Sequence, residues 1–210
     1  MPETIARANH AVFALNSDFF IYRVARTHDP DGATVPIGIE MRAGEVFFEK
    51  PKNPKSKVYP PLDVMAFYPD GSIQLFENST MTSKEILATG ATDTLSFGPI
   101  LVQDGEVSER SRSFGETFQP RTAFGMVNPG HYIAIVVEGR RSGVTEGQSC
   151  LWLADRMAEL GATQAMNLDG GATSVMIFMG EQINRTGNYN SSTNRKQNEI
   201  LAIGHSDAVR

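Results

Sequence analysis

The chain has 210 residues, of which 40% are hydrophobic and 20% charged, and it carries a formal net charge of −5. This composition is typical of a globular protein and not of a disordered chain, and the acidic balance argues against a broad nucleic-acid-binding surface, which needs a basic stripe. From its length we expect a single domain over residues 1–210. Because the only cysteine, Cys150, excludes an intrachain disulfide, an ordinary hydrophobic core must stabilise this domain.

Short strand-like segments separated by turn residues dominate the chain. In chain order, the predicted strands are residues 10–16, two runs between 35 and 48, 64–68 paired with 73–76, 95–102, 121–127 paired with 132–137, 164–168, 175–179 and 200–203. Four prolines between residues 49 and 61 indicate a surface excursion there. The pattern predicts an α+β fold with a mixed, largely antiparallel sheet core.

Helices are few. A short one is predicted over residues 83–91 with Thr82 as its N-cap. The one long helix is predicted over residues 146–160, because Thr145 and Gln148 have the spacing of a capping box and Gly161 is placed to end it.

The segment after the predicted strand 164–168 combines an Asp-Gly turn with further polar groups. A hairpin turn is the ordinary explanation of this dipeptide, and the chain has three other Asp-Gly pairs, at residues 31–32, 70–71 and 104–105. Here, however, alternation lets Asn167 and Asp169 face the same side of the strand end, and two glycines allow close approach of a ligand. The candidate ligand-binding groups of this segment are Asn167, Asp169, Gly170, Gly171, Thr173 and Ser174.

Polar residues also end the first predicted strand, at Asn16 and Asp18. One explanation is an Asx-turn backed by the phenylalanines that follow. The alternative is that both side chains hold sugar hydroxyls or a catalytic water at the edge of the sheet.

Two arginines follow the predicted strand 132–137. Arg140 and Arg141 lie beside glycines and before the predicted long helix, an arrangement suited to bidentate capture of phosphate oxygens. The alternative is a surface ion pair with Glu138. Arg121, at the start of another strand, is either a third anion ligand or a strand-flanking charge.

The sequence lacks the motifs of several common kinds of enzyme site. The four histidines have no zinc-ligand spacing, and neither a Gly-x-Ser-x-Gly elbow nor a P-loop occurs. No cofactor is expected. Oxygen ligands near Asp169 suit a divalent cation, although no dedicated cage for one is evident.

The motifs, taken in order, resemble the phosphodiester glycosidase family over about residues 11–203. The matching segments are Asn16-x-x-Phe19-Phe20, Ser96 to Gly105, Arg121-Thr122-Ala123-x-Gly125, Gly139 to Thr145, Leu153 to Ala162 and Asn167 to Gly171. Ser17 and Asp18 stand where the family pattern has two glycines, and Ala172 and Thr173 where it has a third glycine and a serine. The change at Asp18 could alter the choice of substrate.

The resemblance implies a hydrolase that cleaves the bond between an anomeric carbon and phosphate. It suggests Asp169 as nucleophile or base, with Glu138 as a second-choice carboxylate. The expected phosphate ligands are Arg140 and Arg121, and the expected sugar ligands are Asn16 and Asn167. Alternatives are a glycan-binding module without catalysis and a glycosidase acting on a non-phosphorylated glycan.

The expected partners are a carbohydrate phosphodiester or a cell-surface glycopolymer such as an exopolysaccharide, not nucleic acid. No apolar run reaches the roughly 18 residues of a membrane span. The sequence also has no signal-peptide pattern near its start, whereas the resemblance favours a secreted or surface-exposed protein.

Overall fold

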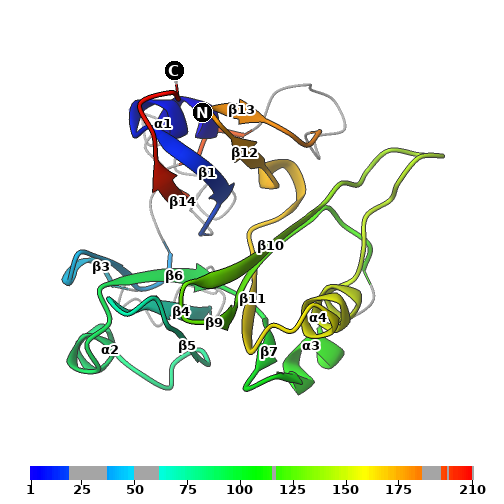
Figure 1. Cartoon of the computed structure of the whole chain (residues 1–210). Coiled ribbons are helices and arrows are strands. Elements are labelled where there is room, and N and C mark those ends of the chain that lie inside the picture. The colour runs from blue at the N-terminus through cyan, green and yellow to red at the C-terminus, as the bar shows by residue number, and fades with distance from the viewer. Residues whose placement is uncertain (19–36, 50–61, 115–116, 186–194, 198, 210) are drawn as a thin grey trace, which may run out of the picture.

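The computed structural model describes residues 1–18, 37–49, 62–114, 117–185, 195–197 and 199–209 (Figure 1). These residues form short helices and antiparallel strands, which confirms the predicted α+β fold. All the strand pairings in this part of the chain are antiparallel, so the parallel pairing that a mixed sheet implies is not found within it. The Asp-Gly pair at 31–32 and most of the predicted excursion 49–61 lie outside the described residues.

The central element is a five-stranded sheet in the order β10-β9-β11-β7-β8. Its strands are β7 (Ile100–Gln103), β8 (Glu106–Val107), β9 (Arg121–Asn128), β10 (His131–Val137) and β11 (Gln164–Leu168). Alternation along β9 and β11 divides the core. Phe124 and Met166 pack against the three-stranded sheet, whereas Ala123 and Ala165 pack against helix α4.

Smaller sheets surround this one. The three-stranded sheet has the order β5-β4-β6, with β4 (Asp63–Phe67), β5 (Ile73–Phe76) and β6 (Asp93–Phe97), and β2 (Glu40–Arg42) pairs with β3 (Glu45–Phe48). A four-stranded sheet has the order β13-β12-β1-β14, with β1 (Ala11–Asn16), β12 (Met176–Phe178), β13 (Glu181–Gln182) and β14 (Ile200–His205). Figure 1 shows this sheet above the others, with β1 descending towards the central sheet.

The helices are α1 (Pro2–Ala8), α2 (Ser83–Ala88), α3 (Glu109–Ser113) and α4 (Cys150–Glu159). The predicted cap of α2 is confirmed, because the Thr82 hydroxyl accepts a hydrogen bond from the Glu85 backbone as part of a capping box. None of the helices within the described residues is long and apolar enough to cross a membrane.

The long helix begins later than the sequence predicts. Ser149, not Thr145, is its N-cap, and the Ser149 hydroxyl accepts a hydrogen bond from the Trp152 backbone at 3.1 Å. The preceding residues form isolated antiparallel β-bridges: Thr145 pairs with Arg141, and Gln148 pairs with Gln119. Backbone committed to these bridges cannot join a helix, so the predicted start at residue 146 was wrong.

The predicted single strand over residues 95–102 is two strands in different sheets. β6 ends at Phe97 and β7 begins at Ile100. Between them, Gly98 adopts φ +110°, and Pro99 has no backbone N–H to donate to a ladder. This break carries the chain from the three-stranded sheet into the central sheet and places Phe97 beside the turn after β11.

Candidate active site

The turn after β11 holds one carboxylate in a fixed position. One oxygen of Asp169, Oδ1, accepts a hydrogen bond from the Gly170 backbone at 2.8 Å, and Oδ2 accepts one from the Thr173 hydroxyl at 2.7 Å. A short 3-10 helix, Gly171–Thr173, follows. Asp169 is only 6% exposed, so burial and these hydrogen bonds restrict the motion of its carboxylate.

Asn16, at the end of β1, stabilises this turn from behind. Its Nδ2 donates to the backbone carbonyl of Asp169 at 2.6 Å, and its Oδ1 accepts from the Thr122 hydroxyl at 2.7 Å and the Val175 backbone at 3.0 Å. The side chain is completely buried, and both of its polar atoms bond to protein. The geometry thus gives Asn16 a supporting position behind Asp169, and its direct contact with sugar stays a prediction.

Asn167 and Ser174, the other polar residues of this region, are buried as well. Asn167 Nδ2 donates to the Gly98 carbonyl at 2.9 Å, whereas its Oδ1 has no hydrogen-bond partner within the described residues. The Ser174 hydroxyl also has none there. Unsatisfied buried acceptors are uncommon in folded proteins, so the Asn167 oxygen can accept a further hydrogen bond, but the residue is only 1% exposed.

Asp169 opens onto a cleft with a volume of about 310 Å³, which lies within the usual range for small-molecule sites. Three of its lining residues are arginines. The complete lining consists of Phe97, Gln119, Pro120, Arg121, Arg140, Asp169, Gly170, Gly171, Ala172 and Arg195. Among these residues, a single carboxylate therefore faces three guanidinium groups.

Arg121 is held almost entirely by backbone oxygens. Its Nε donates to the Gln148 carbonyl at 3.2 Å and its Nη2 to the Thr117 carbonyl at 2.9 Å. The residue is 9% exposed and begins β9. Its position is thus fixed by two neighbouring loop segments, at Thr117 and Gln148, although the start of α4, which follows Gln148, does not line the cleft.

Arg140 lies over Gly171, the second glycine of the turn. Its Nε donates to Gln119 Oε1 at 2.9 Å. A β-carbon at Gly171 would lie 2.8 Å from Nη2 of Arg140, and one at Gly170 would lie 2.7 Å from the Pro120 carbonyl. Both glycines are therefore needed for the close approach of neighbouring groups, in addition to the turn itself.

Arg141 and Glu138 form a separate ion pair. Arg141 Nη1 lies 3.1 Å from Glu138 Oε2, and Glu138 Oε1 accepts from the Arg185 backbone at 2.7 Å. Neither Glu138 nor Arg141 lines the cleft. Of the two alternatives for the arginine pair, the surface ion pair thus describes Arg141, whereas Arg140 faces the cleft. The position of Glu138 gives no support to its predicted catalytic role.

Sequence patterns did not indicate Arg195 or Gln119 as site residues. Arg195 lies in a polar loop, and its backbone N–H donates to the Ala172 carbonyl at 3.4 Å, which attaches this loop to the turn after Asp169. Nearby, Gln197 Nε2 donates to the Thr173 carbonyl at 3.0 Å. No local signal distinguishes Arg195 from any other basic loop residue, because its place depends on a contact with a distant part of the chain.

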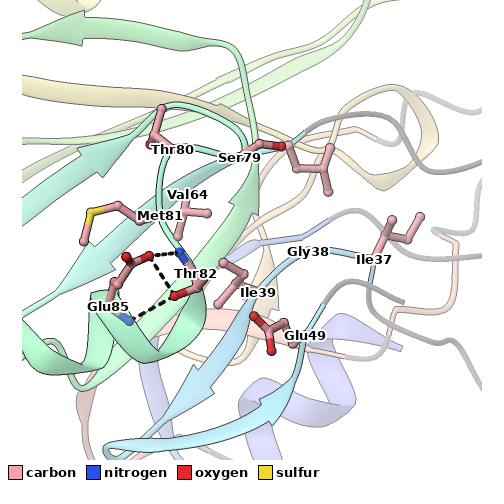
Figure 2. Close-up of a pocket in the computed structure, with 11 residues that line it drawn as sticks. Ile37, Gly38, Ile39, Glu49, Val64, Ser79, Thr80, Met81, Thr82 and Glu85 are labelled. Atoms are coloured by element: carbon pink, nitrogen blue, oxygen red, sulfur yellow. Dashed lines mark hydrogen bonds between the residues drawn. The ribbon is translucent and has the colours of Figure 1, made fainter. Parts of the chain in front are cut away.

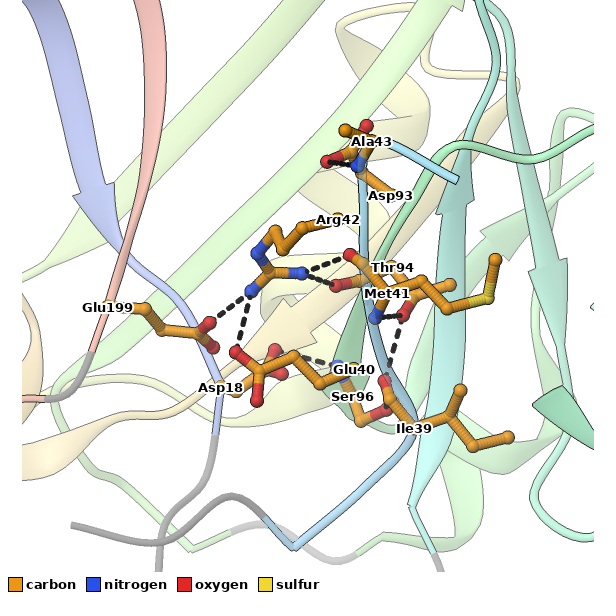
Figure 3. A network of polar contacts seen from close by, with 10 residues as sticks. All are labelled: Asp18, Ile39, Glu40, Met41, Arg42, Ala43, Asp93, Thr94, Ser96 and Glu199. Atoms are coloured by element: carbon orange, nitrogen blue, oxygen red, sulfur yellow. Dashed lines mark hydrogen bonds and ion pairs between the residues drawn. The ribbon is translucent and has the colours of Figure 1, made fainter. Parts of the chain in front are cut away.

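Asp18 lies outside the cleft lining, in a buried network around Arg42 (Figure 3). Its Oδ1 accepts from the Ser96 backbone at 2.6 Å. Arg42 forms ion pairs with Glu40 and Glu199, and its Nη1 donates to the carbonyls of Met41 and Thr94.

These three carboxyl groups share too little positive charge for all of them to ionise. Burial, followed by the charge of Glu199, raises the pKa of Asp18 well above its ordinary value. Burial and contact with Glu199 raise the pKa of Glu40 to about 8. Burial opposes ionisation of Glu199 too, but hydrogen bonding from Glu40 and the charge of Arg42 lower its pKa. Asp18 as a substrate ligand stays a prediction.

A second cavity, of about 370 Å³, lies between β2, β4 and the start of α2 (Figure 2). Its lining includes Ile37, Ile39, Val64 and Met81, and it shares no residue with the arginine-lined cleft. Of its two carboxylates, that of Glu85 is used to cap α2. Although larger, this cavity has no cationic side chain among its described lining residues and is not suited to an anion.

Metal-binding clusters are not found in the part of the chain that the structure describes, where no three His, Cys, Asp or Glu side chains are arranged to hold an ion. The carboxyl groups of Asp18, Glu40 and Glu199 surround the guanidinium of Arg42 instead.

Comparison with known sequences gives two matches. The model of the phosphodiester glycosidase family matches residues 9–203. The SPbeta prophage-derived uncharacterized protein YomE of Bacillus subtilis is 25% identical over an alignment of 178 residues that covers 81% of this chain and 26% of that protein.

Solved structures show the same fold. The catalytic domain of zebrafish N-acetylglucosamine-1-phosphodiester α-N-acetylglucosaminidase, auto-inhibited by its pro-peptide, superposes with a TM-score of 0.72 at 18% identity, over 97% of this chain and 66% of that one. A putative exported protein from Burkholderia pseudomallei gives a TM-score of 0.54 at 15% identity, over 91% and 66% of the two chains. With the family match extending over nearly its whole length, the chain belongs to the phosphodiester glycosidase family.

Proposed function

We propose that the protein hydrolyses the bond between the anomeric carbon and a phosphate oxygen in a sugar-1-phosphodiester. The observation that carries this proposal is that Asp169 lines the same cleft as Arg121 and Arg140. These residues lie far apart in sequence, and both guanidinium groups are oriented by hydrogen bonds from Nε. A carboxylate beside oriented guanidinium groups suits a substrate that has both a sugar and a phosphate.

Asp169 is the proposed nucleophile or general base. Cleavage at an anomeric carbon passes through an oxocarbenium-like transition state, which a nearby carboxylate stabilises or attacks. The hydrogen bonds from Gly170 and Thr173 keep this carboxylate in position before the substrate arrives.

The arginines are proposed to replace a strong general acid. Among the described lining residues Asp169 is the only carboxylate, so the second carboxylate of an ordinary glycosidase has no counterpart there. A phosphate leaving group needs little protonation, since the second pKa of a phosphomonoester is about 6. Arg121 and Arg140 would stabilise the charge that develops on it.

Asn167 stays a proposed sugar ligand, although it is not among the residues that line the cleft. Its buried Oδ1 lacks a partner among the described residues and lies two positions before Asp169. Phosphodiester-linked glycopolymers of cell surfaces, including exopolysaccharides, are the proposed class of natural substrate. Arg195, on the same cleft, would contact the phosphate or the group attached to it.

A panel of synthetic sugar-1-phosphodiesters tests the proposal by measuring release of free sugar. Asp169→Asn should lower kcat by a factor of about 10² to 10⁴, the usual contribution of a positioned acid or base. The variant should fold normally, because an asparagine oxygen can still accept one of the two hydrogen bonds. Full turnover by the folded variant would exclude Asp169 as nucleophile or base.

Adjacent arginines provide a matched comparison. Arg140→Met removes a guanidinium from the cleft, whereas Arg141→Met removes one that pairs with Glu138 outside it. Loss of charge-assisted hydrogen bonds worth about 1.5–3 kcal/mol should reduce kcat/KM by about tenfold to 150-fold for Arg140→Met, with Arg141→Met close to wild type. Equal activity of both variants would favour a glycosidase for non-phosphorylated glycans. Binding without any sugar release would favour a glycan-binding module.

A further inference from the structure

We infer that Gln119 is a positioning residue that sets the orientation of the Arg140 guanidinium, an inference that rests on the proposed function of the cleft. The direct contact is the 2.9 Å hydrogen bond from Arg140 Nε to Gln119 Oε1. Both residues line the cleft. Gln119 has no charge to contribute to an anion, so its effect would pass through the arginine.

Gln119 is itself held by the backbone. It forms an antiparallel bridge with Gln148, in which the Gln119 N–H donates at 3.2 Å and the Gln148 N–H donates at 3.0 Å. Gly147 packs so tightly against Gln119 that a β-carbon there would lie 2.3 Å from its carbonyl. The acceptor oxygen of Gln119 therefore extends from a fixed segment of the chain.

Arg140 needs such support because the contacts of its own loop fix only its backbone and not the end of its long side chain. Its backbone adopts φ +58°, which few non-glycine residues do. Its N–H lies 3.5 Å from the Glu146 carbonyl, and Gly139 packs against the same carbonyl, where a β-carbon would lie at 2.9 Å. These contacts fix the backbone of Arg140. The bond to Gln119 and the packing over Gly171 then restrict the plane of the guanidinium.

Orientation matters most when charge develops on the leaving phosphate. A planar guanidinium donates two parallel hydrogen bonds only when its fork faces the oxygens. Donors arranged in advance stabilise the transition state without reorganising during the reaction. Removing the Gln119 acceptor should therefore lower kcat more than it raises KM, and weaken binding of a phosphate dianion.

Gln119→Met tests this inference, with Gln148→Met as its matched control. Methionine preserves the length of the side chain but cannot accept the bond, and Gln148 is a half-buried glutamine on the same bridge whose backbone, not its side chain, makes the contact. Binding of inorganic phosphate to the full chain, measured by calorimetry, should weaken about tenfold in Gln119→Met and less than twofold in Gln148→Met.

A double-mutant cycle with Arg140→Met tests whether Gln119 affects phosphate binding through Arg140. In the Arg140→Met background, Gln119→Met should cause no further loss of phosphate binding. The Arg140 Nε–H resonance in NMR spectra can be assigned by its loss in Arg140→Met. It should move away from its hydrogen-bonded position in Gln119→Met but stay hydrogen-bonded in Gln119→Glu, which keeps an acceptor oxygen. If Gln119→Met does not fold, Gln119→Ala replaces it in each measurement.

The inference is overturned if wild-type protein does not bind phosphate, if Gln119→Met binds it as wild type does, or if the loss persists in the Arg140→Met background. An equal loss in Gln148→Met would also overturn it, since the bridge and not the side chain would then be responsible. Failure of the proposed reaction is distinguishable from these results. In that case wild type releases no sugar from any phosphodiester, while Gln119→Met still weakens phosphate binding.

Discussion

Replacing Gly171 by alanine should reduce activity strongly while it destabilises the fold only modestly. Gly171 has φ +68°, and its missing side chain leaves room for the Arg140 guanidinium. A β-carbon there would lie 2.8 Å from Nη2, 3.0 Å from Nη1 and 3.1 Å from Cζ of Arg140. Because ordinary van der Waals contact begins near 3.4 Å, the guanidinium must retreat by about 0.6 Å or rotate away.

Two magnitudes follow. The left-handed backbone conformation of an alanine costs about 1–2 kcal/mol of folding free energy. The end of an arginine side chain is flexible, so its displacement adds little to that cost. Catalysis is more sensitive, since a misplacement of about 1 Å near a reacting group can reduce the rate by about a hundredfold. We therefore expect kcat/KM to fall by about tenfold to a hundredfold.

Gly143→Ala is the matched control. Gly143 has φ +72° and lies in the loop that carries Arg140, but a β-carbon there would meet no atom within 4 Å. The free energy of unfolding, measured in urea, should fall by a similar amount in both variants. Sugar release from a sugar-1-phosphodiester should fall only in Gly171→Ala. Equal activity of the two folded variants would refute the placement of Arg140 over Gly171.

Two further predictions concern the buried charges. The raised pKa of Glu40, about 8, means that the folded protein keeps a proton which the unfolded chain releases above about pH 4.5. Neutral Glu40 thus stabilises the fold fully at low pH, and this stability is lost as the pH rises to about 8. Glu40→Gln should therefore flatten the fall of melting temperature between pH 5 and 8, and an unchanged slope would contradict this. Asp63→Ala should lower the free energy of unfolding by about 3–5 kcal/mol, because Asp63 is completely buried, pairs with Arg110 at 3.0 Å and accepts two backbone N–H bonds. The exposed Arg112–Glu109 pair is the comparison, and Arg112→Ala should change stability by less than about 1 kcal/mol.

Local patterns predicted what depends on local chemistry. Strand alternation and turn residues predicted the α+β class, the β4–β5 pair across Asp70-Gly71 and the β9–β10 pair across residues 128–130, because burial of one face dictates such periodicity. The polar turn at Asp169 and the arginine at 140 were also identifiable, since glycines beside charged groups stand out from the surrounding apolar strands.

Contacts between distant segments were not predictable. The sequence could not show that Arg140 would enter the cleft while Arg141 paired with Glu138, because the left-handed backbone at residue 140 is imposed by the docking of its loop. The start of α4 was misplaced for the same reason. Gln148 has a good helix propensity, but its backbone is taken by a bridge to Gln119 that only the folded chain brings together.

The support of Asp169 by Asn16 also has a consequence for synthesis of the chain. These residues are 153 positions apart, and the strand that carries Asn16 obtains both of its neighbours, β12 and β14, from the last part of the sequence. Until β12 has been made, β1 has neither of these partners, even though Asp169 already exists, and it gains the second only with β14. Nascent or truncated polypeptides that lack β12 and β14 should therefore also lack an ordered turn at Asp169.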